Sequence, residues 1–296
     1  MKKNVLLLVA HCWVATLLPA QVSVVSRLPH GPDSRVVLVA AHRADWRNAP
    51  ENSLDAMRRA IRMGVDIIEV DVRRTKDGRF VIMHDPALDR TTTGKGLVAD
   101  YTLAELRELR LLAATGHPTD EKIPTLEEAL EVARGHAVIN LDKAYDHPDE
   151  ILAVVEACHS VDYSLFNIKQ PRDEMRRRYP GFLDKTRYMI VAPLRNREDW
   201  ALIDDYLLHE KPAVIQITFA QETAALLPEM AKIREQGVGL WVNSIWPELD
   251  AGHDDERAVT DPAGAYGWLL QSGVNIIQTD RPALLLEYLR NNQRHP

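Results

Sequence analysis

The sequence is poor in the features that would place it among disulfide-stapled or nucleic-acid-binding proteins. Only two cysteines, Cys12 and Cys158, occur in 296 residues, so a disulfide framework cannot be the basis of the fold. Basic residues number 36 against 43 acidic ones, and the net charge is -7. This balance argues against a general attraction to nucleic-acid phosphates, and we expect no nucleic-acid partner. A Gly-rich dinucleotide or P-loop pattern is also missing.

Long apolar runs are lacking except at the N-terminus, where residues 1–20 read MKKNVLLLVAHCWVATLLPA. Two lysines precede the run, and Leu18-Pro19-Ala20 suits cleavage before Gln21. The pattern predicts a secretory signal peptide, with a buried N-terminal helix as the alternative. We therefore expect an exported protein, periplasmic or secreted, with no stable membrane anchor after cleavage. Residues 21–296 fit a single domain.

Short apolar, β-branched runs alternate with amphipathic stretches, several of which end at a glycine. Parallel strands need such a crossover between them, so the rhythm predicts an α/β fold. Eight units in about 260 residues fit a TIM-type (β/α)8 barrel, and a doubly wound open sheet is the alternative. The runs are residues 36–42, 66–72, 137–143, 165–169, 188–194, 213–219, 238–245 and 274–280.

One further apolar run, FVIMHD, follows EVDVRR after too few residues for a crossover. It predicts a β-hairpin that extends the second strand at the carboxyl-end face of the barrel. If Asp77-Gly78 is a two-residue loop, the register sets Asp71 opposite His84. Directly opposed side chains share a face, so His84 is expected beside Asp71.

The carboxyl ends of the strands, where such barrels carry their active sites, are rich in ionisable side chains. Carboxylate oxygens suit a hard divalent cation, paired imidazoles suit acid and base work, and arginine suits a phosphoryl group. Together they indicate metal-assisted displacement at phosphorus. Each residue alone also has a structural explanation, such as a solvated acid or a core tryptophan. The strand-end residues are His42, Arg43, Glu69, Asp71, Asn140, Asp142, Lys169, Trp241, Asn243, Thr279 and Asp280, with His84 on the hairpin.

The segments AHRADWRNAPENS, EVDVRRTKDGRFVIMHDPALDRTTTG and IIQTDRP together resemble the glycerophosphodiester phosphodiesterase family. The resemblance covers essentially the whole chain after residue 20. It implies a (β/α)8 barrel, one divalent cation (Ca²⁺ or Mg²⁺) and a small-molecule glycerophosphodiester substrate. By this resemblance His42 and His84 form the acid/base pair. Glu69 and Asp71 are metal ligands, and Arg43 clamps the phosphate.

Three positions depart from the family pattern. Ala44 replaces a glycine, which matters if the backbone there needs a positive φ, and Ser53 replaces a threonine. The third metal ligand is expected to be Asp142, with Asn140 as the alternative or as a neighbouring group. In the helix after the first strand, Asn52 is expected to be the N-cap. Lys169 and Trp241 are expected to bind substrate.

The expected reaction is metal-dependent hydrolysis of a glycerophosphodiester to glycerol phosphate and an alcohol. Attack by a glycerol hydroxyl, through a cyclic phosphate, and direct attack by water both fit the sequence. Alternatives are a phospholipase D-like barrel acting on lysophospholipids or other phosphodiesters, and a homologue that binds phosphodiesters without turnover. A metal-free, aldolase-type barrel would use Lys169 and leave Glu69 and Asp71 without a role. The sequence does not indicate an oligomeric state.

Overall fold

The computed structural model describes residues 28, 35–223 and 226–296. The predicted signal peptide lies outside these residues, and the assignment of residues 21–296 to one domain stays a prediction. Of the helices in the described ranges, none is both long and apolar enough to cross a bilayer.

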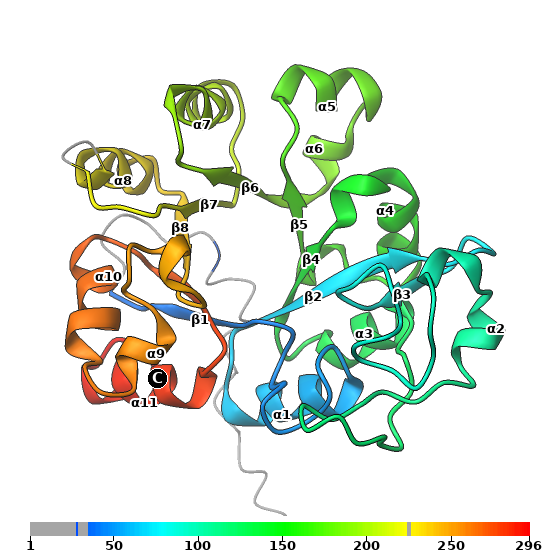
Figure 1. Cartoon of the computed structure of the whole chain (residues 1–296). Helices are drawn as coiled ribbons and strands as arrows, with labels where there is room; N and C mark the ends of the chain where they lie inside the picture. Colours follow the sequence, from blue (N-terminus) through cyan, green and yellow to red (C-terminus); the bar gives the residue numbers. More distant parts are fainter. Residues whose placement is uncertain (1–27, 29–34, 224–225) are drawn as a thin grey trace, which may run out of the picture.

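Within the described chain, nine strands form one sheet in the order β1-β9-β8-β7-β6-β5-β4-β2-β3. Because β1 also pairs with β2, the eight parallel strands close into the predicted barrel, which excludes the open sheet. Helices surround this barrel (Figure 1). The strands are β1 (Leu38–Ala41), β2 (Ile67–Arg74), β3 (Phe80–Ile82), β4 (Val138–Asp142), β5 (Ser164–Ile168), β6 (Arg187–Pro193), β7 (Val214–Thr218), β8 (Gly239–Asn243) and β9 (Ile276–Thr279).

The first helix shows how local sequence sets the element boundaries. Ser53 is its N-cap, because the Ser53 hydroxyl accepts a hydrogen bond from the Ala56 N–H at 3.0 Å. The prediction of Asn52 as the cap is therefore wrong by one residue. Gly64 ends the helix at φ 94°. The helices are α1 (Leu54–Met63), α2 (Leu103–Leu106), α3 (Leu126–Ala133), α4 (Pro148–Ala157), α5 (Arg172–Arg178), α6 (Phe182–Lys185), α7 (Arg197–His209), α8 (Leu226–Glu235), α9 (Asp255–Ala258), α10 (Trp268–Gln271) and α11 (Pro282–Asn291).

The barrel interior is layered, because alternate residues of each strand point inward. The layer near the strand starts is apolar and packs as one cluster. The next inward positions are polar, and the last ones carry most of the ionisable groups predicted from the sequence. The apolar cluster comprises Leu28, Leu38, Ala40, Ile67, Val138, Leu165, Met189, Val214, Trp241 and Ile276.

Strand β3 returns antiparallel to β2, as a hairpin beyond the part of β2 that pairs within the barrel. The register differs by one residue from the predicted one, since Val72 lies opposite Ile82 and Arg73 opposite Val81. The Met83 N–H accordingly donates to the Asp71 carbonyl. The reason is a three-residue loop that closes with Gly78 at φ 76°, where a two-residue loop was expected. The expectation that His84 lies directly opposite Asp71 is therefore wrong.

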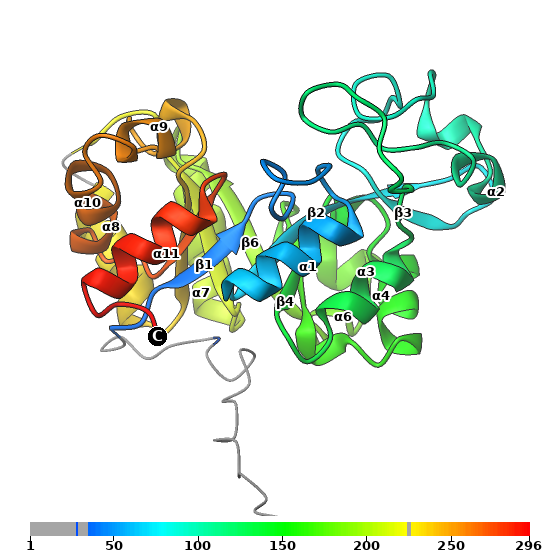
Figure 2. The same ribbon diagram turned by 90° about the horizontal axis from the view of Figure 1, so that it is seen from below.

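Residues 83–123, called here the satellite segment, form a small layer of their own beyond the carboxyl ends of the strands (Figure 2). Their apolar side chains, including Leu88, Leu106 and Ile123, pack together with Val81 of β3 into a separate cluster. The cluster gives this excursion from the barrel a core, so it needs no regular strand or long helix to hold its shape.

Candidate active site

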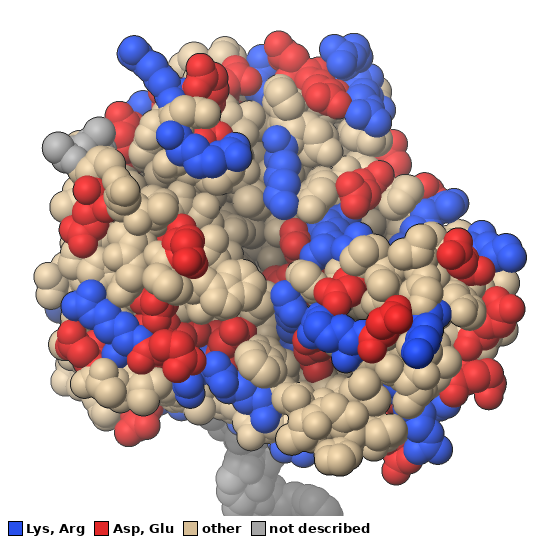
Figure 3. Space-filling view, viewed as in Figure 1, with Lys and Arg blue, Asp and Glu red and all other residues tan. Residues whose placement is uncertain are grey.

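A cavity of about 250 Å³ opens at the carboxyl ends of the barrel strands. Figure 3 shows this hollow near the centre of the face, with basic and acidic side chains at its edge. The strands bring together six of the residues predicted for the site, together with the hairpin histidine. They are His42, Arg43, Glu69, Asp71, Asp142, Lys169 and His84.

Three carboxylates converge at one side of this cavity. Glu69, Asp71 and Asp142 each offer an oxygen, and these oxygens lie within 4.8 Å of one another. Register explains the meeting, because Asp71 of β2 pairs directly with Asp142 of β4. Burial and the neighbouring Asp71 charge raise the pKa of Glu69 from 4.5 to about 8. Such an all-oxygen cluster, unfavourable alone, fits a hard divalent cation.

Lys143 closes over the carboxylates from the end of β4. Strand alternation would point it away, but β4 stops at Asp142 and Lys143 adopts φ 62°. Its ammonium contacts Asp71 and Asp142. Burial lowers the pKa of Lys143, but the charges of Asp71 and Asp142 raise it by more. Lys143 therefore stays charged and partly neutralises the cluster.

Asn140 and Asn167 orient the third carboxylate. The Asn140 amide donates to Asn167 Oδ1 at 2.6 Å, and the Asn167 amide donates to Asp142 Oδ1 at 3.0 Å. Asn140 is fully buried, and its own Oδ1 accepts no hydrogen bond from the described residues. Asn140 thus supports Asp142 through Asn167. In the sheet, Asn140 is paired with Glu69 of β2.

The loop after β1 holds Arg43 against the carboxylates. Arg43 and Ala44 both have positive φ, 52° and 64°, so the glycine of the family pattern is replaced where a left-handed backbone is needed. This turn lets the Arg43 N–H donate to Glu69 at 2.8 Å. The Arg43 Nε is buried, lies 3.8 Å from Asp71 and has no hydrogen-bond partner among the described residues. Arg43 also lines the cavity.

The first histidine is anchored by the end of β9. His42 Nδ1 donates to Asp280 at 2.7 Å, and Trp46 Nε1 donates to the same oxygen at 2.7 Å. Burial lowers the pKa of His42, but the Asp280 hydrogen bond and the Glu69 charge raise it by more. Asp255 fixes the Asp280 backbone in turn, accepting its N–H at 2.6 Å. With Nδ1 committed to Asp280, Nε2 is the nitrogen left for chemistry.

The second histidine belongs to an ion-pair chain that reaches back to Arg43. His84 Nδ1 lies 2.6 Å from Asp85, and Arg90 donates to both Asp85 and Glu51. Glu51 also accepts from Arg43 at 3.2 Å. Burial lowers the pKa of His84, with the Lys143 and Arg43 charges acting in the same direction. Arg90 thereby ties the hairpin to the β1 loop.

Trp241 is not part of the cavity wall, so its prediction as a substrate-binding residue is wrong. The indole is fully buried inside the barrel and donates to Asn243 at 2.7 Å. Trp246, which follows the end of β8, lines the cavity instead, with its ring edge-on to His42. Lys169 lines the cavity as predicted, its ammonium 3.1 Å from the Tyr145 hydroxyl.

Sequence reasoning missed Asn167, Gln216 and Gln278, which also line the cavity. Their signal was present, since each is a polar residue inside an otherwise apolar, buried strand. Lys143 and Trp246 were missed for another reason. Each lies just past its strand, where the backbone direction follows from the fold and not from alternation.

Comparisons with known proteins agree with this geometry. Residues 42–189, half of the chain, match the model of the glycerophosphoryl diester phosphodiesterase family. Residues 188–289 match a domain of unknown function.

Two curated relatives illustrate the sequence similarity. A glycerophosphodiester phosphodiesterase of Caldanaerobacter subterraneus is 48% identical over 96 residues, covering 32% of this chain and 40% of that protein. Glycerophosphodiester phosphodiesterase 1 of Mus musculus is 36% identical over 141 residues, covering 46% and 42%. The chain thus spans less than half the length of either relative.

Solved structures extend the similarity over the barrel as a whole. A glycerophosphoryl diester phosphodiesterase of Parabacteroides distasonis superposes with a TM-score of 0.74 at 25% identity, over 91% of each chain. A phosphodiesterase of Oleispira antarctica, in complex with the product sn-glycerol-3-phosphate, superposes with a TM-score of 0.64 at 23% identity, over 90% of this chain and 99% of that one.

Proposed function

Because this chain belongs to the glycerophosphoryl diester phosphodiesterase family, we propose that it hydrolyses glycerophosphodiesters to glycerol phosphate and an alcohol. The observation that carries the proposal is one cavity that joins three carboxylates, two carboxylate-anchored histidines and an arginine. The structural relative that holds sn-glycerol-3-phosphate as its product supports the same class of small molecule.

Glu69, Asp71 and Asp142 would hold the divalent cation, Ca²⁺ or Mg²⁺. The fit rests on the donor set, which is three clustered carboxylates. When bound, the cation would supply positive charge to the non-bridging phosphoryl oxygens. Arg43, which lines the cavity, would bind the same oxygens through its guanidinium.

The two histidines would divide the proton transfers. One imidazole accepts the proton of the attacking hydroxyl, either of substrate glycerol or of water, and the other protonates the departing alkoxide. Asp280 and Asp85 each hold one ring through Nδ1, which leaves both Nε2 atoms for the reaction. Lys169 and Trp246, at the cavity wall, would contact the glycerol or the alcohol.

The test uses purified protein and glycerophosphocholine, with glycerol 3-phosphate as the measured product. We expect turnover that EDTA abolishes and that Mg²⁺ or Ca²⁺ restores. His42→Ala and His84→Ala should each lose at least a hundredfold in kcat, whereas His136→Ala, at an exposed histidine beyond α3, should keep wild-type activity. Turnover in EDTA would refute the metal requirement. Tight substrate binding without product would instead identify a binding protein.

We also propose that the protein is exported. The N-terminal segment of the sequence supports export to the periplasm or the medium, as expected from its lysines and apolar run. Detection of the mature protein, beginning at Gln21, in the exported fraction would test this.

A further inference from the structure

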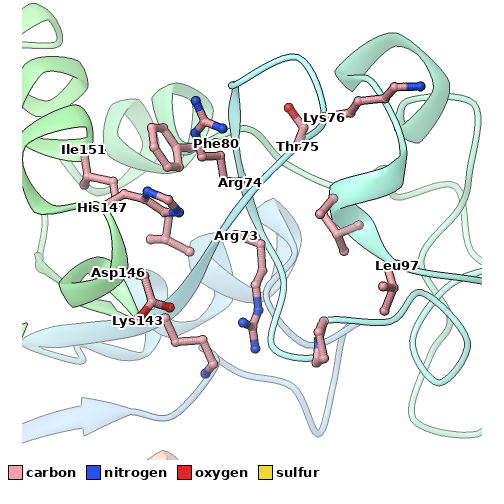
Figure 4. A pocket seen from close by; sticks show the side chains of 14 residues that line it. Arg73, Arg74, Thr75, Lys76, Phe80, Leu97, Lys143, Asp146, His147 and Ile151 are labelled. Atoms are coloured by element: carbon pink, nitrogen blue, oxygen red, sulfur yellow. The ribbon is translucent and has the colours of Figure 1, made fainter.

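A second cavity, of about 390 Å³, lies beside the β2–β3 hairpin (Figure 4). We call it the hairpin pocket. Val72, Phe80 and Ile151, all buried, form its apolar floor, and Val98 of the satellite segment adds to it. Leu97 stands at the rim with 48% of its surface exposed. The site described above uses none of these five residues.

The hairpin pocket and the catalytic cavity share a wall. Lys143 lines the pocket, while its ammonium contacts the carboxylates Asp71 and Asp142. Arg73 also lines the pocket, and its guanidinium donates to the His84 carbonyl at 2.6 Å. Figure 4 shows both side chains running toward the same end of the pocket. That end therefore borders the reacting groups.

The charges around the pocket favour a negatively charged ligand. Arg73, Arg74, Lys76 and Lys143 line it, against the single carboxylate of Asp146. Of these four, Arg74 is ion-paired with Glu150, and Lys143 is ion-paired with Asp71 and Asp142. The hydrogen bonds of the Arg73 side chain within the described residues go to a neutral carbonyl, so its charge is not cancelled by a contacting acid. An apolar floor ending at basic groups matches a molecule with a hydrocarbon part joined to an anion. A phosphodiester with an alkyl substituent is such a molecule.

We propose that the hairpin pocket binds the alcohol substituent of the phosphodiester, and that the enzyme favours linear alkyl substituents. The proposal rests on the proposed function, because it needs the phosphoryl group to lie in the catalytic cavity. In the reaction the oxygen of water forms a new bond to phosphorus, the bond to the alkanol oxygen breaks, and the alkanol leaves with a proton. Each methylene buried on the floor should raise kcat/KM roughly fourfold until the pocket is full.

The experiment measures kcat/KM for a series of glycerophosphoalkanols, from the methyl to the dodecyl ester, each below its micelle concentration. Every member releases glycerol 3-phosphate, so one assay serves the whole series. Ala99→Trp should fill the pocket and flatten the rise, because Ala99 lines the pocket and is exposed to solvent. Leu97→Glu, which places a negative charge at the rim, should also flatten it. Ala104→Trp, the same substitution at an exposed position of α2, is the matched control and should keep the rise.

The outcomes separate the two proposals. Turnover of the methyl ester with no rise along the series would overturn the pocket assignment and leave the proposed function standing. If kcat/KM rises along the series and Ala99→Trp and Leu97→Glu both leave that rise unchanged, the alkyl substituent binds elsewhere, and the assignment is also overturned. If no member of the series is turned over, the proposed function itself fails, and the pocket assignment fails with it.

Discussion

Removal of one carboxylate from the cluster should stabilise the metal-free protein. Glu69 is 4% exposed, and burial with the charge of Asp71 raises its pKa from 4.5 to about 8. Folded protein therefore holds a proton on Glu69 between these pH values, whereas unfolded chain does not. Stability contributed by Glu69 consequently falls as the pH rises from 4.5 to 8. At about 1.4 kcal/mol per pKa unit, the loss is on the order of 5 kcal/mol above pH 8.

Glu69→Gln removes this charge and can still accept the Arg43 N–H through its amide oxygen. We expect its free energy of unfolding in EDTA to exceed that of the wild type by a few kcal/mol at pH 8.5, and to be nearly equal at pH 4.5. Urea unfolding at the two pH values measures both quantities. Glu108→Gln, at an exposed glutamate, should show no such pH-dependent gain. An equal difference between Glu69→Gln and wild type at both pH values would refute the reasoning.

The site also predicts the effects of three further substitutions. Asp280→Asn replaces a charge-assisted hydrogen bond to His42 with a neutral one, worth about 1–1.5 kcal/mol less, so kcat should fall roughly tenfold; wild-type kcat would contradict this. Arg90→Lys cannot bond Glu51 and Asp85 together, so kcat should fall several-fold with little change in melting temperature, and a large thermal loss would show a structural role instead. Ala44→Gly relieves about 1 kcal/mol of left-handed backbone strain. It also loses about 0.8 kcal/mol of methyl burial and increases the conformational entropy of the unfolded chain. The free energy of unfolding measured in urea should therefore change by less than about 1 kcal/mol.

The barrel was predictable because alternation is a local property of each strand. Glu69, Asp71 and Asp142 follow from it directly, since inward positions repeat every second residue and neighbouring strands align. The register of the hairpin was not predictable, because Thr75 to Arg79 fit both a two-residue and a three-residue loop. The choice between these loops shifts every cross-strand residue pair by one position.

Side chains placed by unusual backbone were also beyond prediction. Lys143 enters the site, and Asn52 donates to Asp71 at 2.9 Å, because both residues adopt a positive φ. For residues other than glycine this conformation is uncommon and is decided by tertiary contacts. The role of Trp241 was predicted wrongly because its side chain points into the barrel core. A tryptophan in a strand fills the barrel, whereas Trp246, just beyond the strand, is free to face the cavity.

The hydrogen bond from the Met83 N–H to the Asp71 carbonyl joins the start of the satellite segment to β2. It fixes the chain to the barrel one residue before His84, so the barrel sets where the histidine begins its excursion. If the hairpin pocket binds the substituent as proposed, exchanging residues 97–123 for those of a relative should alter which substituents are accepted while His84 keeps its anchor. Chimaeric proteins joined within this segment are thus a natural way to redesign selectivity.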